Sequence, residues 1–267
     1  MSESHFGYPR TLLLLMTSVV TTALVFLLTT PASAAITGTG TCVGITSPLT
    51  ANLTCVGDVY VDGGSTLNIG NDTANVTLDV GSGTVCVGFS ATAPCNTLAG
   101  SGTIIVDPPT ATGTYGRIVA TNMVVASGSV IQTNGTGCPA SQSYDASIPG
   151  CANKGSGATA GFGEGSDATT NSSGGGGGSY GGAGGSGYVG HAGGNVYGSV
   201  DLTTIQLGSG GGNNTVGVGV AGGAGGGAMR LDVSGTLTVD GTISANGTNG
   251  LTGTPVGCSS AHATIII

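Results

Sequence analysis

Eleven acidic residues follow position 35, and they are the side chains that could act on a sugar chain. Glycosidic cleavage needs two carboxyl groups placed on either side of one bond. No acid adjoins another in the sequence. Asp58 and Asp62 are four residues apart, but they lack the acid-rich loop that a Ca²⁺ site needs. The eleven residues are Asp58, Asp62, Asp72, Asp79, Asp107, Asp145, Glu164, Asp167, Asp201, Asp232 and Asp240.

Basic and imidazole side chains do not complete an active site. Arg117, Lys154 and Arg230 are isolated in the sequence, so we do not expect binding of an anionic polysaccharide. His191 lies in a glycine-rich tract without the serine and aspartate partners of a triad. We therefore assign no catalytic, cofactor-binding or metal-ligating residue, and we expect a protein that is not an enzyme and uses no cofactor.

Seven cysteines indicate an oxidising compartment. Six of them form couples that are close in sequence, whereas Cys258 has no nearby partner and is expected to be unpaired within this chain. A metal site is not expected, since no C-x-x-C motif occurs. The expected disulfides are Cys42–Cys55, Cys86–Cys95 and Cys138–Cys151.

Residues 1–34 have the pattern of a secretory signal peptide. A polar start with Arg10 precedes an apolar run over residues 11–28, and Ala32-Ser33-Ala34 forms an A-x-A cleavage site. No later stretch is apolar and long enough to cross a membrane. We therefore expect a secreted or cell-surface protein.

The composition supports export and excludes some partners. Of 267 residues, 55 are Gly. Only four are Lys or Arg, and four basic side chains are too few to neutralise a phosphate backbone. We therefore expect no nucleic-acid partner. Seven Asn-x-Ser/Thr sequons would supply a glycan coat to a chain with 6% charged residues. These candidates are Asn52, Asn71, Asn75, Asn134, Asn171, Asn213 and Asn246.

Short alternating segments bounded by glycine or Asn-Gly predict an all-β chain. A parallel β-helix fits best, with Leu237, Val239 and Ile243 stacked inside and with Gly241 and Gly247 at corners that need positive φ. A β-sandwich is the alternative. The predicted strands, apart from the first copy of the repeat described below, span residues 59–61, 65–69, 76–80, 84–87, 103–106, 200–207, 229–233, 236–239 and 242–245.

An ungapped internal repeat with an offset of 113 residues favours stacked units. It places Arg117 opposite Arg230 and Val124 opposite Leu237, and each copy then reaches a cysteine. Because the loop that follows the second cysteine is cut short, we expect the sequence to be a fragment.

Residues 155–227 are nearly half glycine and form a separate region. We expect a loosely structured insertion, since few side chains can be buried there. Packed polyproline-II-like runs are a second interpretation. The resulting layout is a signal peptide (1–34), an N-terminal cap (35–57), a first β-helix part (58–154), the glycine-rich insertion (155–227) and a second, truncated β-helix part (228–267).

The string GGAGGGAMRLDVSGTLTVDGTISANGTNG at residues 222–250 resembles a pattern of large secreted cell-surface proteins with pectin-lyase-like right-handed parallel β-helices. The resemblance covers this string well and residues 100–137 loosely. It implies a right-handed β-helix with an adhesin-like, surface or matrix role, and it transfers no active-site residue.

We therefore expect a non-enzymatic structural or adhesive protein whose partners are cell-wall or matrix polysaccharides or other surface proteins. One alternative is a pectin-lyase-like carbohydrate-active enzyme or a polysaccharide-binding module. A second alternative is an ice-binding β-solenoid. Thr-x-Thr occurs at Thr39, Thr236 and Thr252, but the sequence does not show the regular threonine ladder that an ice-binding surface needs.

Overall fold

A computed structural model gives the arrangement of the chain. It describes residues 36–70, 75–91, 95–108, 115–140, 143–145, 148–152, 175–180, 183–187, 191–197, 205–213, 221–250 and 265–267. The expected signal peptide, Lys154 and Cys258 lie outside these residues. Regular structure in the described part is all β, which confirms the predicted class, and no helix suited to crossing a membrane occurs there.

Sixteen short strands occur in the described part. They are β1 (Ile36–Gly38), β2 (Leu53–Thr54), β3 (Val59–Val61), β4 (Thr66–Gly70), β5 (Thr77–Asp79), β6 (Thr84–Val87), β7 (Thr103–Asp107), β8 (Gly116–Ala120), β9 (Asn122–Val125), β10 (Val130–Gln132), β11 (Ser143–Asp145), β12 (Ile148–Ala152), β13 (Met229–Val233), β14 (Leu237–Val239), β15 (Thr242–Ser244) and β16 (Ile265–Ile266). Their bounds agree closely with most predicted segments. The predicted strand over residues 200–207 is the exception, because its described part, residues 205–207, pairs in no β-ladder.

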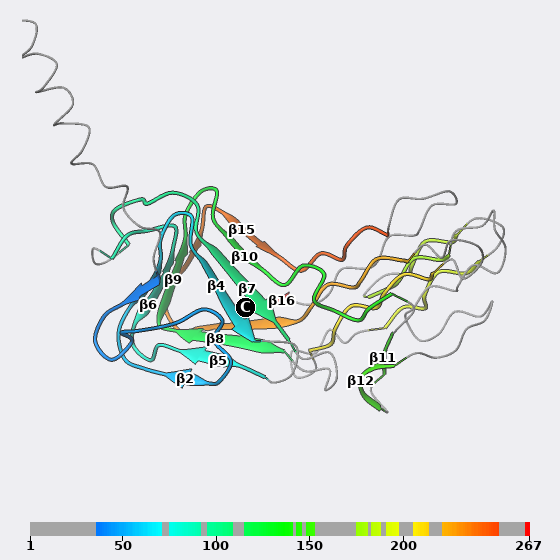
Figure 1. Ribbon diagram of the computed structural model, residues 1–267, viewed down its shortest axis with the longest axis horizontal. Coiled ribbons are helices and arrows are strands. Elements are labelled where there is room, and N and C mark those ends of the chain that lie inside the picture. Colours follow the sequence, from blue (N-terminus) through cyan, green and yellow to red (C-terminus); the bar gives the residue numbers. More distant parts are fainter. Residues whose placement is uncertain are drawn as a thin grey trace, which may run out of the picture. The chain divides into compact units, whose positions relative to one another are not determined.

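Three sheets contain most of these strands (Figure 1). Sheet A has the order β1-β3-β6-β9-β14, sheet B has β15-β10-β7-β4, and sheet C has β16-β13-β8-β5-β2. The chain passes through sheets C, A and B in that order four times, from β2–β4 to β13–β15. We call each such passage a layer. All pairs within these sheets are parallel except β1 with β3, and β11 with β12 forms a separate antiparallel pair.

Alternating side chains give each sheet one inward face. In sheet C, Leu78, Ile118 and Leu231 are in register on adjacent strands, and all three are fully buried. Sheet B stacks Leu67, Ile104 and Ile131 in the same way. Aligned β-branched and aliphatic side chains thus form one continuous core between the three sheets.

Side-chain acceptors join the layers at the turns. In each case an Asn or Asp carbonyl or carboxylate oxygen accepts the backbone N–H of a residue in the next layer, at 2.6–2.9 Å. The acceptor and donor pairs are Asn52 with Thr77, Asp58 with Thr84, Asn122 with Thr236, and Asn134 with Asn246. Backbone groups that leave the ladder at a corner are therefore still satisfied.

Three positions in the last layer, Val239, Gly241 and Gly247, differ from expectation, and Gly247 lacks positive φ as Gly241 does. Val239 pairs with Val125, which points inward and is fully buried. The Val239 side chain nevertheless remains 41% exposed, because β14 is the last strand of sheet A. Gly241 does not adopt positive φ. A Cβ there would lie 2.3 Å from the Ser129 oxygen, so glycine permits a close approach to the preceding layer rather than a left-handed turn.

The described part of residues 155–227 is packed, in contrast to the loosely structured insertion that we expected. Gly177 donates to Gly185, Gly184 donates to Gly194 and Gly194 donates back to Gly177, at 2.8–3.0 Å. None of these residues belongs to a β-ladder, although Figure 1 shows neighbouring segments that run side by side. Glycine allows such an approach because no Cβ intervenes, which agrees with the second interpretation of the sequence.

Three disulfides, Cys42–Cys55, Cys86–Cys95 and Cys138–Cys151, occur in the structure, and they are the pairs that the spacing predicted. Cys42–Cys55 closes the segment between β1 and β3, and Cys86–Cys95 holds the loop after β6 against sheet A. Covalent links of this kind reduce the entropy of the unfolded, glycine-rich chain.

Mass mapping of a non-reduced digest should recover these three links from the oxidised chain. The physical reason is proximity, since the Cα atoms of each pair lie 5.1–5.6 Å apart, within the normal range for a disulfide. A reduced and alkylated sample serves as the control. Dominant links between Cys55 and Cys86, or between Cys95 and Cys138, would contradict the arrangement.

Candidate functional site

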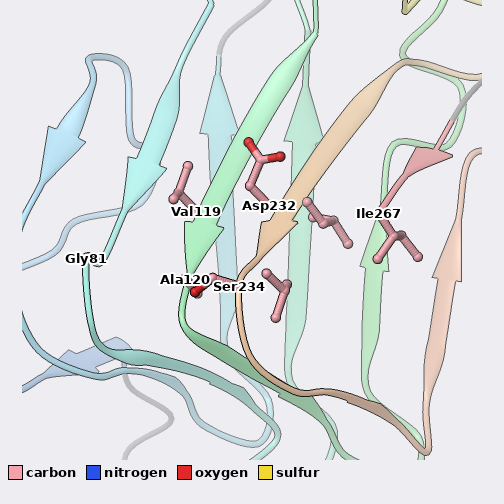
Figure 2. Close-up of a pocket in the computed structure, with 8 residues that line it drawn as sticks. Gly81, Val119, Ala120, Asp232, Ser234 and Ile267 are labelled. Carbon is pink, nitrogen blue, oxygen red and sulfur yellow. The ribbon is translucent and has the colours of Figure 1, made fainter. Parts of the chain in front are cut away.

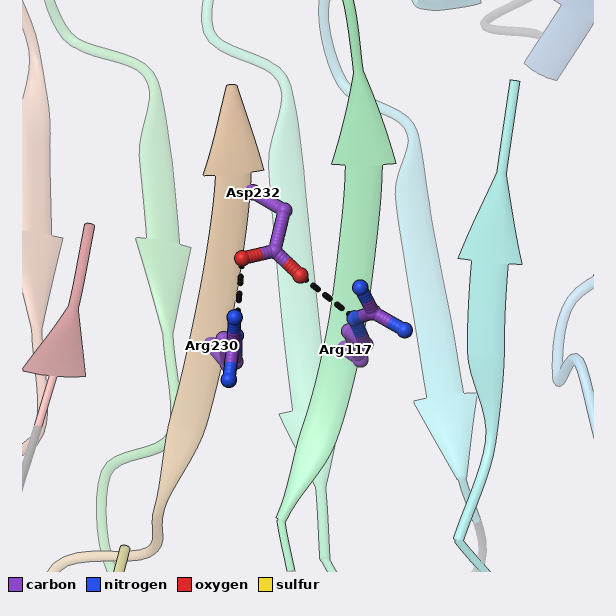
Figure 3. Close-up of polar contacts among 3 residues, drawn as sticks. All are labelled: Arg117, Arg230 and Asp232. Atoms are coloured by element: carbon purple, nitrogen blue, oxygen red, sulfur yellow. Dashed lines mark hydrogen bonds and ion pairs between the residues drawn. The ribbon is translucent and has the colours of Figure 1, made fainter. Parts of the chain in front are cut away.

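A charged cluster lies on the outward face of sheet C (Figure 3). Arg117 of β8 and Arg230 of β13 are directly opposite each other in the parallel register, and Asp232 is two residues further along β13. Its carboxylate accepts from Arg117 Nε at 2.5 Å and from Arg230 Nε at 2.7 Å. Two cations in register would repel each other, and the shared aspartate offsets this repulsion.

Both arginines are isolated in the sequence, but the structure places them side by side. The 113-residue repeat contained the signal, because it set Arg117 opposite Arg230. The role of Asp232 was missed. It becomes visible only once β13 is known to be parallel to β8, with residues 230 and 232 on one face.

The environment keeps Asp232 ionised. Partial burial alone would raise the pKa of this carboxyl, but the hydrogen bonds and positive charges of Arg230 and Arg117 outweigh it and lower the pKa below its usual value. A general acid for glycosidic cleavage needs the opposite shift. Asp232 is therefore suited to holding two strands together rather than to donating a proton.

A pH series should show this contribution. Since the folded-state pKa of Asp232 is lowered, its stabilising effect is present above the unfolded pKa of about 4 and is lost as the pH falls through the lower folded value. The thermal midpoint of Asp232→Asn should lie below that of the wild type at neutral pH, and the gap should close in acid. Asp240→Asn, at an exposed position after β14, is the matched control. A gap that is independent of pH would contradict this role.

A second acid lies in the same row of sheet C. Asp79 is in register with Val119, and Val119 is in register with Asp232, so the two acids are two strands apart, about 9.6 Å along the sheet. This is near the separation found in inverting glycosidases. However, Asp232 is held by two arginines and does not have the environment of a general acid, and Asp79 accepts the N–H of Gly81 at 2.9 Å.

A hollow of about 350 Å³ lies beside this cluster, at the end of β13 (Figure 2). It is lined by Gly81, by Val119 and Ala120 of β8, by residues 231–234, and by Ile267. Most of the lining residues are aliphatic, and Asp232 is the residue with a charged side chain among them. The hollow can therefore accept a small apolar group, but its ionised side chain is already engaged by the arginines.

Asp58 and Asp62 do not form a shared cation site. They flank β3, which places them about 13 Å apart along an extended strand. Asp58 accepts from the Thr84 N–H and from the Tyr60 hydroxyl. One oxygen of Asp62 is buried without a hydrogen-bond partner, and burial raises the pKa of this carboxyl. Within the described residues, no group of three or more His, Cys, Asp or Glu side chains could hold a metal.

His191 is buried in the glycine-rich region, with 6% of its surface exposed. Its Nδ1 has no hydrogen-bond partner among the described residues, so no serine or aspartate orients the ring there. Asp107 is half-buried at the end of β7. The acids at Asp72, Asp145, Glu164, Asp167 and Asp201 lie where side chains are not described.

Several sequon asparagines have structural contacts. Asn52 and Asn134 join layers through their side-chain oxygens, and Asn213 accepts the Gly222 N–H at 2.9 Å. The Asn134 amide nitrogen, which would carry a glycan, donates to Gln132 at 2.6 Å. Asn75 and Asn246 are exposed, and Asn71 and Asn171 lie outside the described residues.

Comparison of the chain with protein-family models, with curated proteins and with solved structures gave no match.

Proposed function

We propose that the chain is a right-handed parallel β-helix that acts as a non-enzymatic structural or adhesive protein outside the cell. The observation that carries this proposal is the repeated order of sheets C, A and B, with parallel pairing between equivalent strands of successive layers. A β-sandwich is built from antiparallel sheets, so the parallel register argues for the β-helix.

Stacked layers would make a stiff scaffold. Each layer contacts only the layers before and after it, so length is gained by repetition and the outward faces remain available for contacts. The antiparallel strand β1 lies at one edge of sheet A, which is consistent with a cap over residues 35–57. Capping an open edge would limit unwanted pairing with other chains.

Extracellular placement is supported by chemistry as well as by the signal-peptide pattern. The three disulfides fit an oxidising compartment. The chain has few charged residues, and the Asp232 carboxylate is already bound by two arginines. Both features favour binding of neutral polysaccharides or surface proteins over catalysis of a reaction on them. The resemblance of residues 222–250 to secreted β-helical surface proteins points to the same role.

Adhesion can be tested by displaying the oxidised full chain on host cells and measuring their retention on neutral polysaccharide and on cell-wall material. We expect retention without release of reducing ends. Ile104→Asp, which places a charge in the core, should abolish retention, and Asp232→Asn should not. Polysaccharide turnover that Asp232→Asn removes would overturn the proposal in favour of an enzyme. Equal retention of cells without the chain would also overturn it.

A further inference from the structure

Eight side chains form two straight rows on the outward face of sheet B, whose strands β4, β7, β10 and β15 lie side by side in Figure 1. The parallel register brings each row together from four separate layers. The first row is Thr66, Thr103, Val130 and Thr242, and the second row is Asn68, Ile105, Gln132 and Ser244.

The first row is chemically uniform. Thr66, Thr103, Val130 and Thr242 are all β-branched, so each presents a methyl group at the same point of the side chain, and three also present a hydroxyl. Neighbours in the row are about 4.8 Å apart, and the two rows are about 6.6 Å apart. Methyl groups therefore repeat at a regular spacing along the first row, with a hydroxyl at three of its four positions, whereas the second row is chemically mixed.

The side chains of this face are held in place by the core beneath them. Between the rows, Leu67, Ile104 and Ile131 point inward and are fully buried. β-branched side chains have few rotamers, so the positions of the outward groups are largely set by the sheet. Thr66 and Thr242 are exposed, and the other six members of the rows are half-buried beside one another.

The other two sheets present different surfaces. Sheet C carries the Arg117–Asp232–Arg230 cluster, and sheet A is covered by a loop that places Phe89 over Tyr60 and Cys86. None of the eight residues in the two rows is charged or aromatic, and the charged side chain on the same face is Asp107, at the end of β7. Sugar rings are usually bound by aromatic side chains and anions by cations, so neither class of ligand fits this face well.

From this regular row of Thr66, Thr103, Val130 and Thr242 we infer that the outward face of sheet B binds the surface of an ice crystal. Ice presents water oxygens at fixed repeats, and a rigid row of hydroxyl and methyl groups can order water in the same pattern. The inference needs only the register of sheet B and is independent of the proposed adhesive role. The Thr-x-Thr pairs of the sequence do not contribute, because the row takes one residue from each layer.

The test is the freezing behaviour of the oxidised full chain, measured as thermal hysteresis and as inhibition of ice recrystallisation. We expect both effects in the wild type. Thr103→Lys, in the middle of the first row, should remove most of the activity because its long charged side chain interrupts the regular row. Thr77→Lys is the matched control, since Thr77 lies on the outward face of sheet C beside Arg117.

A third variant tests the geometry rather than the fold. Val130→Thr completes the threonine row and should retain or increase the freezing effect, with unchanged thermal stability. Absence of thermal hysteresis and of recrystallisation inhibition in the wild type would overturn the inference. Equal losses in Thr103→Lys and Thr77→Lys would also overturn it, as would Thr103-dependent binding to insoluble polysaccharide without any effect on ice.

Discussion

Truncation of Ile104 to alanine is expected to lower the free energy of unfolding by about 2–5 kcal/mol. Ile104 is fully buried on β7, between the inward side chains of Leu67 and Ile131 in the adjacent layers. Its loss leaves a cavity in a core that is only a few side chains wide, and parallel ladders on both sides limit relaxation. Denaturant unfolding followed by circular dichroism measures the change.

Ile105 provides the matched control, since it is the next residue on the same strand and has the same side chain. It points outward and is half-buried. Ile105→Ala should therefore cost about 1 kcal/mol or less, mainly through lost β propensity and partial burial. Equal effects of the two substitutions would contradict the register, because a one-residue slip exchanges the inner and outer faces of a strand.

Substitution of Gly225 by alanine is expected to disrupt the packed glycine-rich region. A Cβ at this position would lie 2.0 Å from the Gly208 backbone oxygen, so the backbone must move. The same residue donates to the Cys138 carbonyl at 2.9 Å, and Cys138 donates to Gly208 at 2.9 Å, so one added methyl disturbs three segments. Overpacking of this kind costs about 1–3 kcal/mol or more. Faster amide exchange at Gly208 and Cys138 would report it.

Gly185→Ala is the control for the glycine prediction. It lies in the same region, but a Cβ there would meet no atom within 4 Å. It should leave exchange at Gly208 unchanged and should alter stability little. If both variants behave alike, the described glycine segments are not packed as the structure has them, and the loosely structured insertion would be the better description.

The internal repeat of the sequence predicts the strand register correctly in one sheet and incorrectly in the other two. Its constant offset is correct for β8 and β13, where Arg117 pairs with Arg230. In sheet A, however, Leu237 pairs with Met123 rather than with Val124, and in sheet B Ile243 pairs with Ile131 rather than with Val130. In the second copy the connection from sheet C to sheet A is one residue longer and the connection from sheet A to sheet B is two residues shorter, and the ladder keeps inward residues opposite inward residues.

Local chemistry in the sequence determined the all-β class, most strand positions and the three disulfides. Alternation with period two and cysteines 9 or 13 residues apart are short-range signals that need no knowledge of the fold. The tertiary structure alone decided which residues became neighbours. Arg117 forms an ion pair with Asp232, and the row that includes Thr66 and Thr242 takes one residue from each of four layers. Glycines that are distant in the sequence lie within hydrogen-bonding distance of one another. Such contacts depend on where each corner ends, and corner lengths leave no periodic mark in the sequence.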